Sequence, residues 1–184
     1  MAAESAFVEL ARKIVEKTLR PRLSVERSAP LLYQVTVDNR LSLAVDVKHP
    51  TRGNSAYQTD LCVFERKSAD VSIPRVVMEF KTRITTHDVL TYSAKATKHK
   101  QVYPYLRYGL VASGLATIPG RLFTHNESLD FCACVSGLAG KKLADFFQSL
   151  LKAEIGASRR LEEIAFGDVQ TRLFRTEVIL DRFR

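Results

Sequence analysis

The stretch RVVMEFKTR, residues 75–83, decides the fold because it sets two opposite charges inside an apolar run. Alternate residues of a strand point to the same face, so Val77, Glu79 and Lys81 share one face, and the residues between them form a second, wholly apolar face. A charge buried without a partner is unfavourable by several kcal/mol. Glu79 and Lys81 therefore either pair with each other at the end of a strand or belong to a functional site.

The composition is that of one globular domain spanning residues 1–184. Hydrophobic residues make up 46% of the chain and charged residues 26%, which is enough apolar material for a core of ordinary size. The net charge of +8 and a pI near 9.6 are typical of proteins with a polyanionic partner such as nucleic acid, although a basic balance also occurs on an ordinary soluble surface.

The cysteines and the N-terminal segment indicate a soluble protein of a reducing compartment. Cys62, Cys132 and Cys134 are odd in number and lack the paired spacing of a zinc site, so we expect reduced core residues. Glu4 and Glu9 interrupt the region where a signal peptide needs a continuous apolar stretch, and no later run is long enough to cross a bilayer. The expected location is the cytoplasm, with no membrane partner.

Hydrophobic periodicity predicts the order helix, three strands, helix, two strands, helix. The expected helices cover residues 4–19, 86–103 and 141–155, and the expected strands lie within 31–47, 58–67, 75–83, 108–116 and 129–137. The first three strands would form an antiparallel meander, and residues 121–131 would be a hairpin connection between the last two. A short helix and a final element within residues 172–183 complete the prediction.

Each of the first two helices carries a stripe that should face the sheet. The stripe consists of Phe7, Leu10, Ala11 and Ile14 in the first helix, and of Leu90, Ala94, Thr97 and Gln101 in the second. The second helix opens at a segment, Thr85 to Asp88, that resembles a capping box. A polar residue such as Gln101 on a buried stripe indicates either a satisfied core side chain or a functional group.

Asp60 completes a three-residue pattern with Glu79 and Lys81. It begins the neighbouring strand, and an antiparallel pairing would bring its carboxylate beside that of Glu79. Two carboxylates provide the oxygen ligands that Mg²⁺ prefers, and a lysine ammonium nearby can hold a water molecule or a phosphate oxygen. The three side chains therefore predict a divalent-metal site.

This pattern resembles the PD-(D/E)XK nuclease superfamily, which includes many type II restriction endonucleases. The resemblance rests on Asp60, eighteen intervening residues and the triplet Glu79-Phe80-Lys81, together with the order of elements from residue 4 to about residue 136. Thr59 stands where the family's motif has proline. The resemblance implies an α/β fold with a restriction-endonuclease-like core, in which helices flank a mixed central β-sheet in the order α-β-β-β-α-β-β-α.

The same spacing occurs a second time, one strand earlier. Asp46 is followed after eighteen residues by Glu65-Arg66-Lys67. That triplet runs into a polar turn, where charges are solvated, whereas the triplet at residues 79–81 adjoins an apolar run. We therefore favour the later set.

Several further residues gain a role from the resemblance. Many of these nucleases carry Gln-x-x-x-Tyr on the helix after the Glu-x-Lys strand, and Gln101 and Tyr105 match it. The first helix often supplies another acid to the metal, for which Glu4 is a better candidate than Glu9, although either also fits a solvated helix residue. The expected nucleic-acid contacts are Arg83, Lys95, Lys98, Lys100 and Tyr105, which also fit a solvated helix face and core packing.

The resemblance implies a Mg²⁺-dependent DNA endonuclease, in which Mn²⁺ can replace Mg²⁺. The metal ligands would be Asp60, Glu79 and the Phe80 carbonyl. Lys81 would position or help deprotonate the attacking water, and Gln101 would orient Lys81 or the water.

Three alternatives stay open within this interpretation. A restriction-type enzyme, which usually works as a homodimer, is favoured because the chain is compact and carries no appended domain. A Holliday-junction or repair nuclease of the same fold is the nearest rival. The alternative from another class is a DNA-binding module without catalysis, in which Glu79 and Lys81 form only a structural ion pair.

Overall fold

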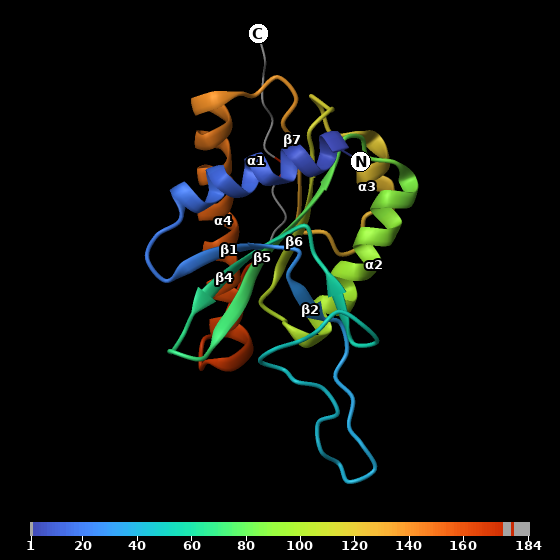
Figure 1. Ribbon diagram of the computed structural model, residues 1–184, viewed down its shortest axis with the longest axis vertical. Helices are drawn as coiled ribbons and strands as arrows, with labels where there is room; N and C mark the ends of the chain where they lie inside the picture. The colour runs from blue at the N-terminus through green and yellow to red at the C-terminus, as the bar shows by residue number, and fades with distance from the viewer. Residues whose placement is uncertain (1, 175–177, 179–184) are drawn as a thin grey trace.

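The computed structural model describes residues 2–174 and residue 178, and in it helices cover both faces of a five-stranded sheet (Figure 1). The helices are α1 (Ala2–Thr18), α2 (Thr86–Val102), α3 (Gly120–His125) and α4 (Gly140–Phe166). The sheet contains β1 (Leu23–Arg27), β4 (Leu61–Arg66), β5 (Ser72–Lys81), β6 (Arg107–Ala112) and β7 (Phe131–Cys134), in the order β1-β4-β5-β6-β7. A separate two-stranded sheet consists of β2 (Pro30–Leu32) and β3 (Ala56–Gln58). The α/β class with a mixed central sheet flanked by helices is confirmed.

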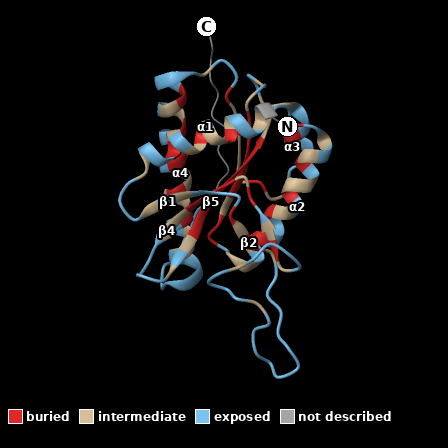
Figure 2. Ribbon diagram, viewed as in Figure 1, coloured by how far each residue is buried: buried red, intermediate tan, exposed pale blue. Residues whose placement is uncertain are grey.

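Strand β5 lies at the centre of the large sheet and is buried on both faces (Figure 2). It pairs antiparallel with β4 and parallel with β6, and the parallel neighbours are joined by crossovers through α2 and α3. As the sequence predicts, its faces alternate: Val76, Met78 and Phe80 enter the core under α1 and α4, and Val77 enters the core under α2 and α3. The charged end of β5 therefore emerges between two packed layers.

Residues 33–55, called the projection below, extend away from the sheet instead of forming the first predicted strand (Figure 1). An isolated bridge between Val37 and Leu43 joins its two arms, and Leu41 at the tip is 85% exposed. The alternating apolar pattern of residues 31–47 does not pair with β4, because β1 occupies that place in the sheet. Of the predicted segment, only Leu31 and Leu32 lie in a strand, β2, and it belongs to the small sheet. Strand β1 was missed because its short sequence LSVER is largely polar.

Helix α2 begins and ends close to the predicted residues, and the capping box of Thr85 and Asp88 is present. Its sheet-facing side is nevertheless rotated from the predicted stripe. The buried residues are Val89, Ser93, Ala96 and His99, whereas Leu90, Ala94, Thr97 and Gln101 are exposed. Ser93 Oγ accepts the backbone N–H groups of Glu127 and Ser128, and His99 Nδ1 donates to the Leu32 carbonyl at 2.9 Å. Ser93 is thus satisfied in the core by local partners, whereas His99 is satisfied only at Nδ1, because its buried Nε2 has no hydrogen-bond partner among the described residues.

Helix α1 shows the same kind of shift. Its fully buried residues are Val8, Ala11 and Val15, whereas Leu10, placed on the predicted stripe, is 48% exposed. The stripe that packs on the sheet includes valine positions that the predicted pattern omitted.

The C-terminal part departs from the prediction in two places. The connection at residues 121–131 is no hairpin, because it contains part of α3 and joins two parallel strands. Helix α4 continues to Phe166, through the region where a separate short helix was expected. Most of the final element expected within residues 172–183 lies outside the described residues.

The cysteine prediction is confirmed: Cys62 is buried, Cys132 and Cys134 are partly buried, and all three are free. Among the helices of residues 2–174, none combines the length and the apolar character needed to cross a membrane.

Candidate active site at the end of strand β5

Asp60 and Glu79 lie side by side where β4 begins and β5 approaches its end. The register pairs Leu61 with Met78, which places Asp60 opposite Glu79. The Asp60 backbone N–H donates to Glu79 Oε2 at 3.3 Å, and the Phe80 backbone N–H donates to Asp60 Oδ2 at 2.8 Å. Asp60 and Glu79, which were expected to lie close together, are therefore linked by hydrogen bonds between backbone N–H groups and the two carboxylates.

Glu79 is a buried carboxylate in an electrostatically unfavourable place. It is 3% exposed, and its Oε1 accepts a hydrogen bond from the Tyr108 hydroxyl at 2.6 Å. Burial and the neighbouring Asp60 carboxylate raise the pKa of Glu79 to about 7, although the Tyr108 hydrogen bond and the charge of Lys95 act in the opposite direction. The charge of Asp60 therefore opposes the ionisation of Glu79, and a cation between the two side chains would offset this repulsion.

Lys81 ends β5 and pairs with α1 rather than with Glu79. Its Nζ lies 3.4 Å from Glu4 Oε1 and 5.4 Å from the centroid of the Tyr92 ring. Burial alone lowers the pKa of Lys81, but the Tyr92 side chain and the Glu4 carboxylate outweigh burial, so the pKa is raised. Lys81 is therefore an ammonium ion at neutral pH. The alternative in which Glu79 and Lys81 satisfy each other does not hold, since each has another partner.

The oxygen atoms around Asp60 suit a hard divalent cation. Because the N–H and C=O of one strand residue point to the same side, and the Phe80 N–H points at Asp60, the Phe80 carbonyl faces that side as well. Two carboxylates and a carbonyl fit Mg²⁺, which commonly keeps several waters and takes further oxygens from substrate phosphates. No group of three acidic, histidine or cysteine side chains that could hold a metal occurs among the described residues. Glu4, expected as a further ligand, pairs with Lys81 instead.

Helix α2 brings a second ammonium group to the site. Lys95 Nζ lies 4.9 Å from the Tyr92 ring centroid and 5.6 Å from the Tyr57 ring centroid. Lys95 and Asp60 line the same pocket, and the charge of Lys95 lowers the pKa of Glu79. Lys95 was predicted to contact nucleic acid. The sequence around it does not indicate that its ammonium group lies against two tyrosine rings, one of them from β3.

Gln101 and Tyr105 do not join the site. Gln101 is exposed because the sheet-facing side of α2 is rotated, and α2 ends at Val102, so Tyr105 does not lie on the same helical face. Tyr105 is only 8% exposed, and the Arg75 guanidinium carbon lies 5.5 Å from its ring centroid. The expected roles of Gln101 in orienting Lys81 and of Tyr105 in binding nucleic acid are therefore corrected.

The basic residues expected to contact nucleic acid differ in their surroundings. Lys100 is held on the protein, because its Nζ lies 2.7 Å from Asp130 Oδ2 and donates to the Ser128 carbonyl at 2.6 Å. It is a structural residue, which corrects the prediction. Arg83 and Lys98 are exposed and stay candidates for contacts with phosphate groups.

The second match to the motif is dispersed. Asp46 lies in the projection, where its Oδ1 accepts the backbone N–H groups of Lys48 and His49. Glu65 instead forms ion pairs with two arginines, one of which is the buried Arg75. The geometry supports the set that contains the carboxylate pair of residues 60 and 79.

Tyr108 is the residue of the site whose role the sequence analysis missed. It is fully buried, and its hydroxyl donates to Glu79 Oε1. Its position follows from the parallel register of β5 and β6, in which Glu79 lies opposite Leu110. A parallel register depends on the crossover helix, so it leaves no local signal in the sequence.

No protein-family model matches this sequence, and a search of curated proteins finds no significant match.

Proposed function

We propose that this chain is a Mg²⁺-dependent DNA endonuclease with a PD-(D/E)XK-type site on a restriction-endonuclease-like core. The observation that carries the proposal is the contact of Asp60 with Glu79 and Phe80, with Lys81 at the end of the same strand. The mixed sheet agrees with the core that the resemblance implies, and the net charge of +8 favours a polyanionic substrate.

Each residue of the site has a defined task in this proposal. Asp60, Glu79 and the Phe80 carbonyl would hold Mg²⁺, which supplies Lewis-acid stabilisation of the charge that builds up on the phosphate. Lys81 is already protonated, so it donates a hydrogen bond to a phosphate oxygen or to the attacking water rather than accepting a proton. The ion pair with Glu4 would hold the ammonium group of Lys81 in place.

Cleavage of supercoiled plasmid DNA with Mg²⁺, with Mn²⁺ or with EDTA tests the proposal. We expect cleavage only with a divalent metal. Glu79→Ala and Lys81→Ala should each lower the cleavage rate by about two orders of magnitude or more, because the first removes a proposed metal ligand and the second removes the cation next to the phosphate. Binding of DNA in EDTA should change little, since neither side chain makes the main contacts with the DNA backbone.

Asp60→Asn and Asp46→Asn form a matched pair that separates the two motif matches. Asp60→Asn should abolish cleavage, whereas Asp46→Asn should leave it unchanged, because an amide oxygen can still accept the two backbone N–H groups in the projection. Normal cleavage by Glu79→Ala, Lys81→Ala or Asp60→Asn contradicts the proposed site.

A comparison of substrates distinguishes the two kinds of nuclease. A restriction-type enzyme should give discrete fragments from linear duplex DNA. A Holliday-junction or repair nuclease should instead prefer branched or single-stranded DNA on the same gel.

A DNA-binding module without catalysis is the second candidate, and it is favoured by the presence of only two carboxylates at the site among the described residues. Calorimetric titration with Mg²⁺ and Mn²⁺ separates it from the enzyme. The enzyme should bind a metal ion in a manner lost in Asp60→Asn, whereas the module should show no such binding. The same DNA-binding measurement in EDTA gives equal results for both candidates.

A further inference from the structure

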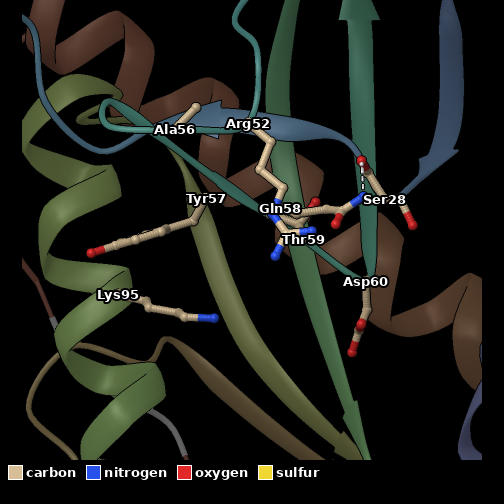
Figure 3. A pocket seen from close by; sticks show the side chains of 9 residues that line it. Ser28, Arg52, Ala56, Tyr57, Gln58, Thr59, Asp60 and Lys95 are labelled. Atoms are coloured by element: carbon tan, nitrogen blue, oxygen red, sulfur yellow. Dashed lines mark hydrogen bonds between the residues drawn. The ribbon is translucent and has the colours of Figure 1, made fainter.

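A pocket of about 350 Å³ lies beside the candidate active site, at α2 and the two-stranded sheet of β2 and β3 (Figure 3). Its lining includes Ser28, Arg52, Tyr57, Gln58, Asp60 and Lys95. Lys95 extends from α2 below the Tyr57 ring, and the Arg52 side chain points toward Gln58 (Figure 3). Because Asp60 belongs both to the pocket and to the carboxylate pair, a group bound in the pocket lies next to the reacting centre.

The two cations that line this pocket form no ion pair with any of the described residues. Buried or partly buried cations elsewhere have a carboxylate partner: Arg75, Arg107 and Lys100 at less than 3 Å. The partner of Lys81, Glu4, lies at 3.4 Å. Arg52 and Lys95 take part in none of the ion pairs formed among residues 2–174 and 178. The lining of the pocket thus carries two positive charges and a single carboxylate, that of Asp60.

Lys95 is held in place before any ligand arrives. Its ammonium group lies near the rings of Tyr92 and Tyr57. Tyr57 is fixed in turn, because it stacks on Tyr33 with ring centroids 4.0 Å apart and meets the edge of the His99 ring at 5.9 Å. A cation already ordered by aromatic side chains loses little conformational entropy when it binds an anion.

We propose that this pocket is a phosphate-binding subsite, in which Arg52 and Lys95 hold the phosphate group of the nucleotide next to the scissile bond. The guanidinium fork of Arg52 matches two phosphate oxygens, and Lys95 acts as a point charge beside it. The polar side chains of Ser28 and Gln58 supply further donors around the same space. This inference rests on the proposed function and extends it by assigning the place where the substrate backbone binds.

Binding of oligonucleotides in EDTA tests the subsite without any cleavage step. The probes are a short single strand and a duplex of the same sequence, each measured by fluorescence anisotropy at several salt concentrations. Arg52→Gln and Lys95→Gln should each weaken binding by about 3- to 10-fold. The slope of log affinity against log salt should fall by about 0.7 for the single strand and about 0.9 for the duplex, as expected for one lost phosphate contact.

Two variants provide controls of equal charge change. Arg40→Gln removes an exposed arginine from the same projection, and Lys141→Gln removes a lysine that is 86% exposed on α4. Both should bind DNA within about 2-fold of the wild type, because the effect of total charge alone is screened at physiological salt. Equal losses in these controls and in the two pocket variants overturn the subsite.

Titration with small ligands identifies the group that is recognised. Inorganic phosphate and a 5′-phosphorylated dinucleotide should perturb the amide NMR signals of residues 52–60 and 95, and these shifts should vanish in the double variant of Arg52 and Lys95. A nucleoside without phosphate should leave them unchanged. Equal shifts with the nucleoside, or with an acidic peptide in place of phosphate, overturn the assignment.

The outcomes separate the subsite from the enzyme. A protein that never cleaves DNA, but loses affinity in Arg52→Gln and Lys95→Gln, keeps the subsite and contradicts the proposed activity. A protein that cleaves DNA with Mg²⁺, but binds equally well in both variants, keeps the activity and contradicts the subsite.

Discussion

Glu79 is the residue whose ionisation governs the charge balance of the candidate site. Its pKa is raised from its ordinary value of 4.5 to about 7 by burial and by Asp60. The folded protein therefore binds this proton more tightly than the unfolded chain does. The resulting stability is fully present below the unfolded pKa and is lost as the pH rises through the folded pKa, between about 4.5 and 7.

Glu79→Gln should remove this pH dependence. Between about pH 4.5 and 7.5, the free energy of unfolding of the wild type should fall relative to that of the variant by an amount on the order of 3 kcal/mol. Glutamine keeps an oxygen that can accept from Tyr108 and carries no charge against Asp60. Urea unfolding at several pH values, without divalent metal, measures the difference.

Glu127→Gln is the matched control because Glu127 is an exposed glutamate. Its stability should follow that of the wild type across the whole pH range. If the free energies of unfolding of the wild type and of Glu79→Gln changed with pH in parallel, Glu79 would titrate as an ordinary carboxyl group. Added Mg²⁺ should reduce the difference between these two proteins above pH 7, because a cation favours the ionised form of Glu79.

The sequence indicates some residues of the site far better than others. Glu79, Lys81 and Asp60 stand out because charges adjoin an apolar strand, and an antiparallel neighbour places Asp60 opposite Glu79. Gln101 and Tyr105 matched a spacing pattern, but their positions depend on the rotation of α2 and on its end at Val102. Such features are fixed by tertiary packing, so a local pattern does not determine them.

At the scale of elements, a buried arginine fixes α4 on the sheet. Arg75 of β5 is fully buried, its Nε donates to Glu65 of β4 at 2.7 Å, and its Nη1 donates to Ser158 of α4 at 3.3 Å. Glu162, also on α4, accepts from Nη2. One guanidinium group on β5 thus satisfies three acceptors from two other elements, β4 and α4, a set that the sequence analysis of residues 75–83 did not predict.

Arg75→Ala should destabilise the protein by about 3–5 kcal/mol, because it leaves Glu65 and Glu162 without their shared partner and opens a cavity. Urea unfolding at pH 7 measures the loss. Lys141→Ala serves as the control, since the pair of Lys141 with Asp145 is exposed and should contribute less than about 1 kcal/mol. A loss below about 1 kcal/mol in Arg75→Ala would show that Arg159 and Lys67 suffice to hold Glu65 and Glu162.

The difference between predicted and observed elements has one physical origin. Helices α1, α2 and α4 were predicted close to their places because 3.6-residue periodicity is local. The strand expected within residues 31–47 has the same period-2 pattern as a true strand, but pairing needs a free neighbour, and β1 takes that place. Tertiary competition for a sheet edge thus overrides strand propensity.

At the scale of the whole molecule, the site is assembled from segments that are distant in the chain. Glu4 of α1 contacts Lys81 of β5, and the ring of Tyr57 of β3 lies against Lys95 of α2. The sequence motif predicts only those residues of the site that lie at β4 and β5. The pocket forms where the base of the projection, with Arg52, lies beside Lys95 of α2. This placement was not predictable from the sequence.

The tip of the projection should be dispensable for this assembly. The Ala44 backbone N–H donates to the Thr36 carbonyl at 2.9 Å, so the two arms are adjacent there. Residues 37–43 lie beyond that contact and are exposed, with Leu41 at 85%. Joining Thr36 to Ala44 through Asn-Gly removes this tip, shortens the loop and leaves Arg52 in place.

The shortened protein should unfold within about 0.5 kcal/mol of the wild type, because the deleted side chains bury little apolar surface and a shorter loop closes at a slightly lower entropic cost. Its affinity for DNA in EDTA should also be unchanged, since the pocket is retained. Tyr33→Ala tests the base of the projection in parallel and should weaken binding, because Tyr33 stacks on Tyr57, which in turn lies against Lys95. Thermal unfolding followed by circular dichroism, with anisotropy in EDTA, measures both variants. Loss of cooperative unfolding in the shortened protein would mean that the tip packs on the domain, and the separation of a folded core from an exposed projection would then be wrong.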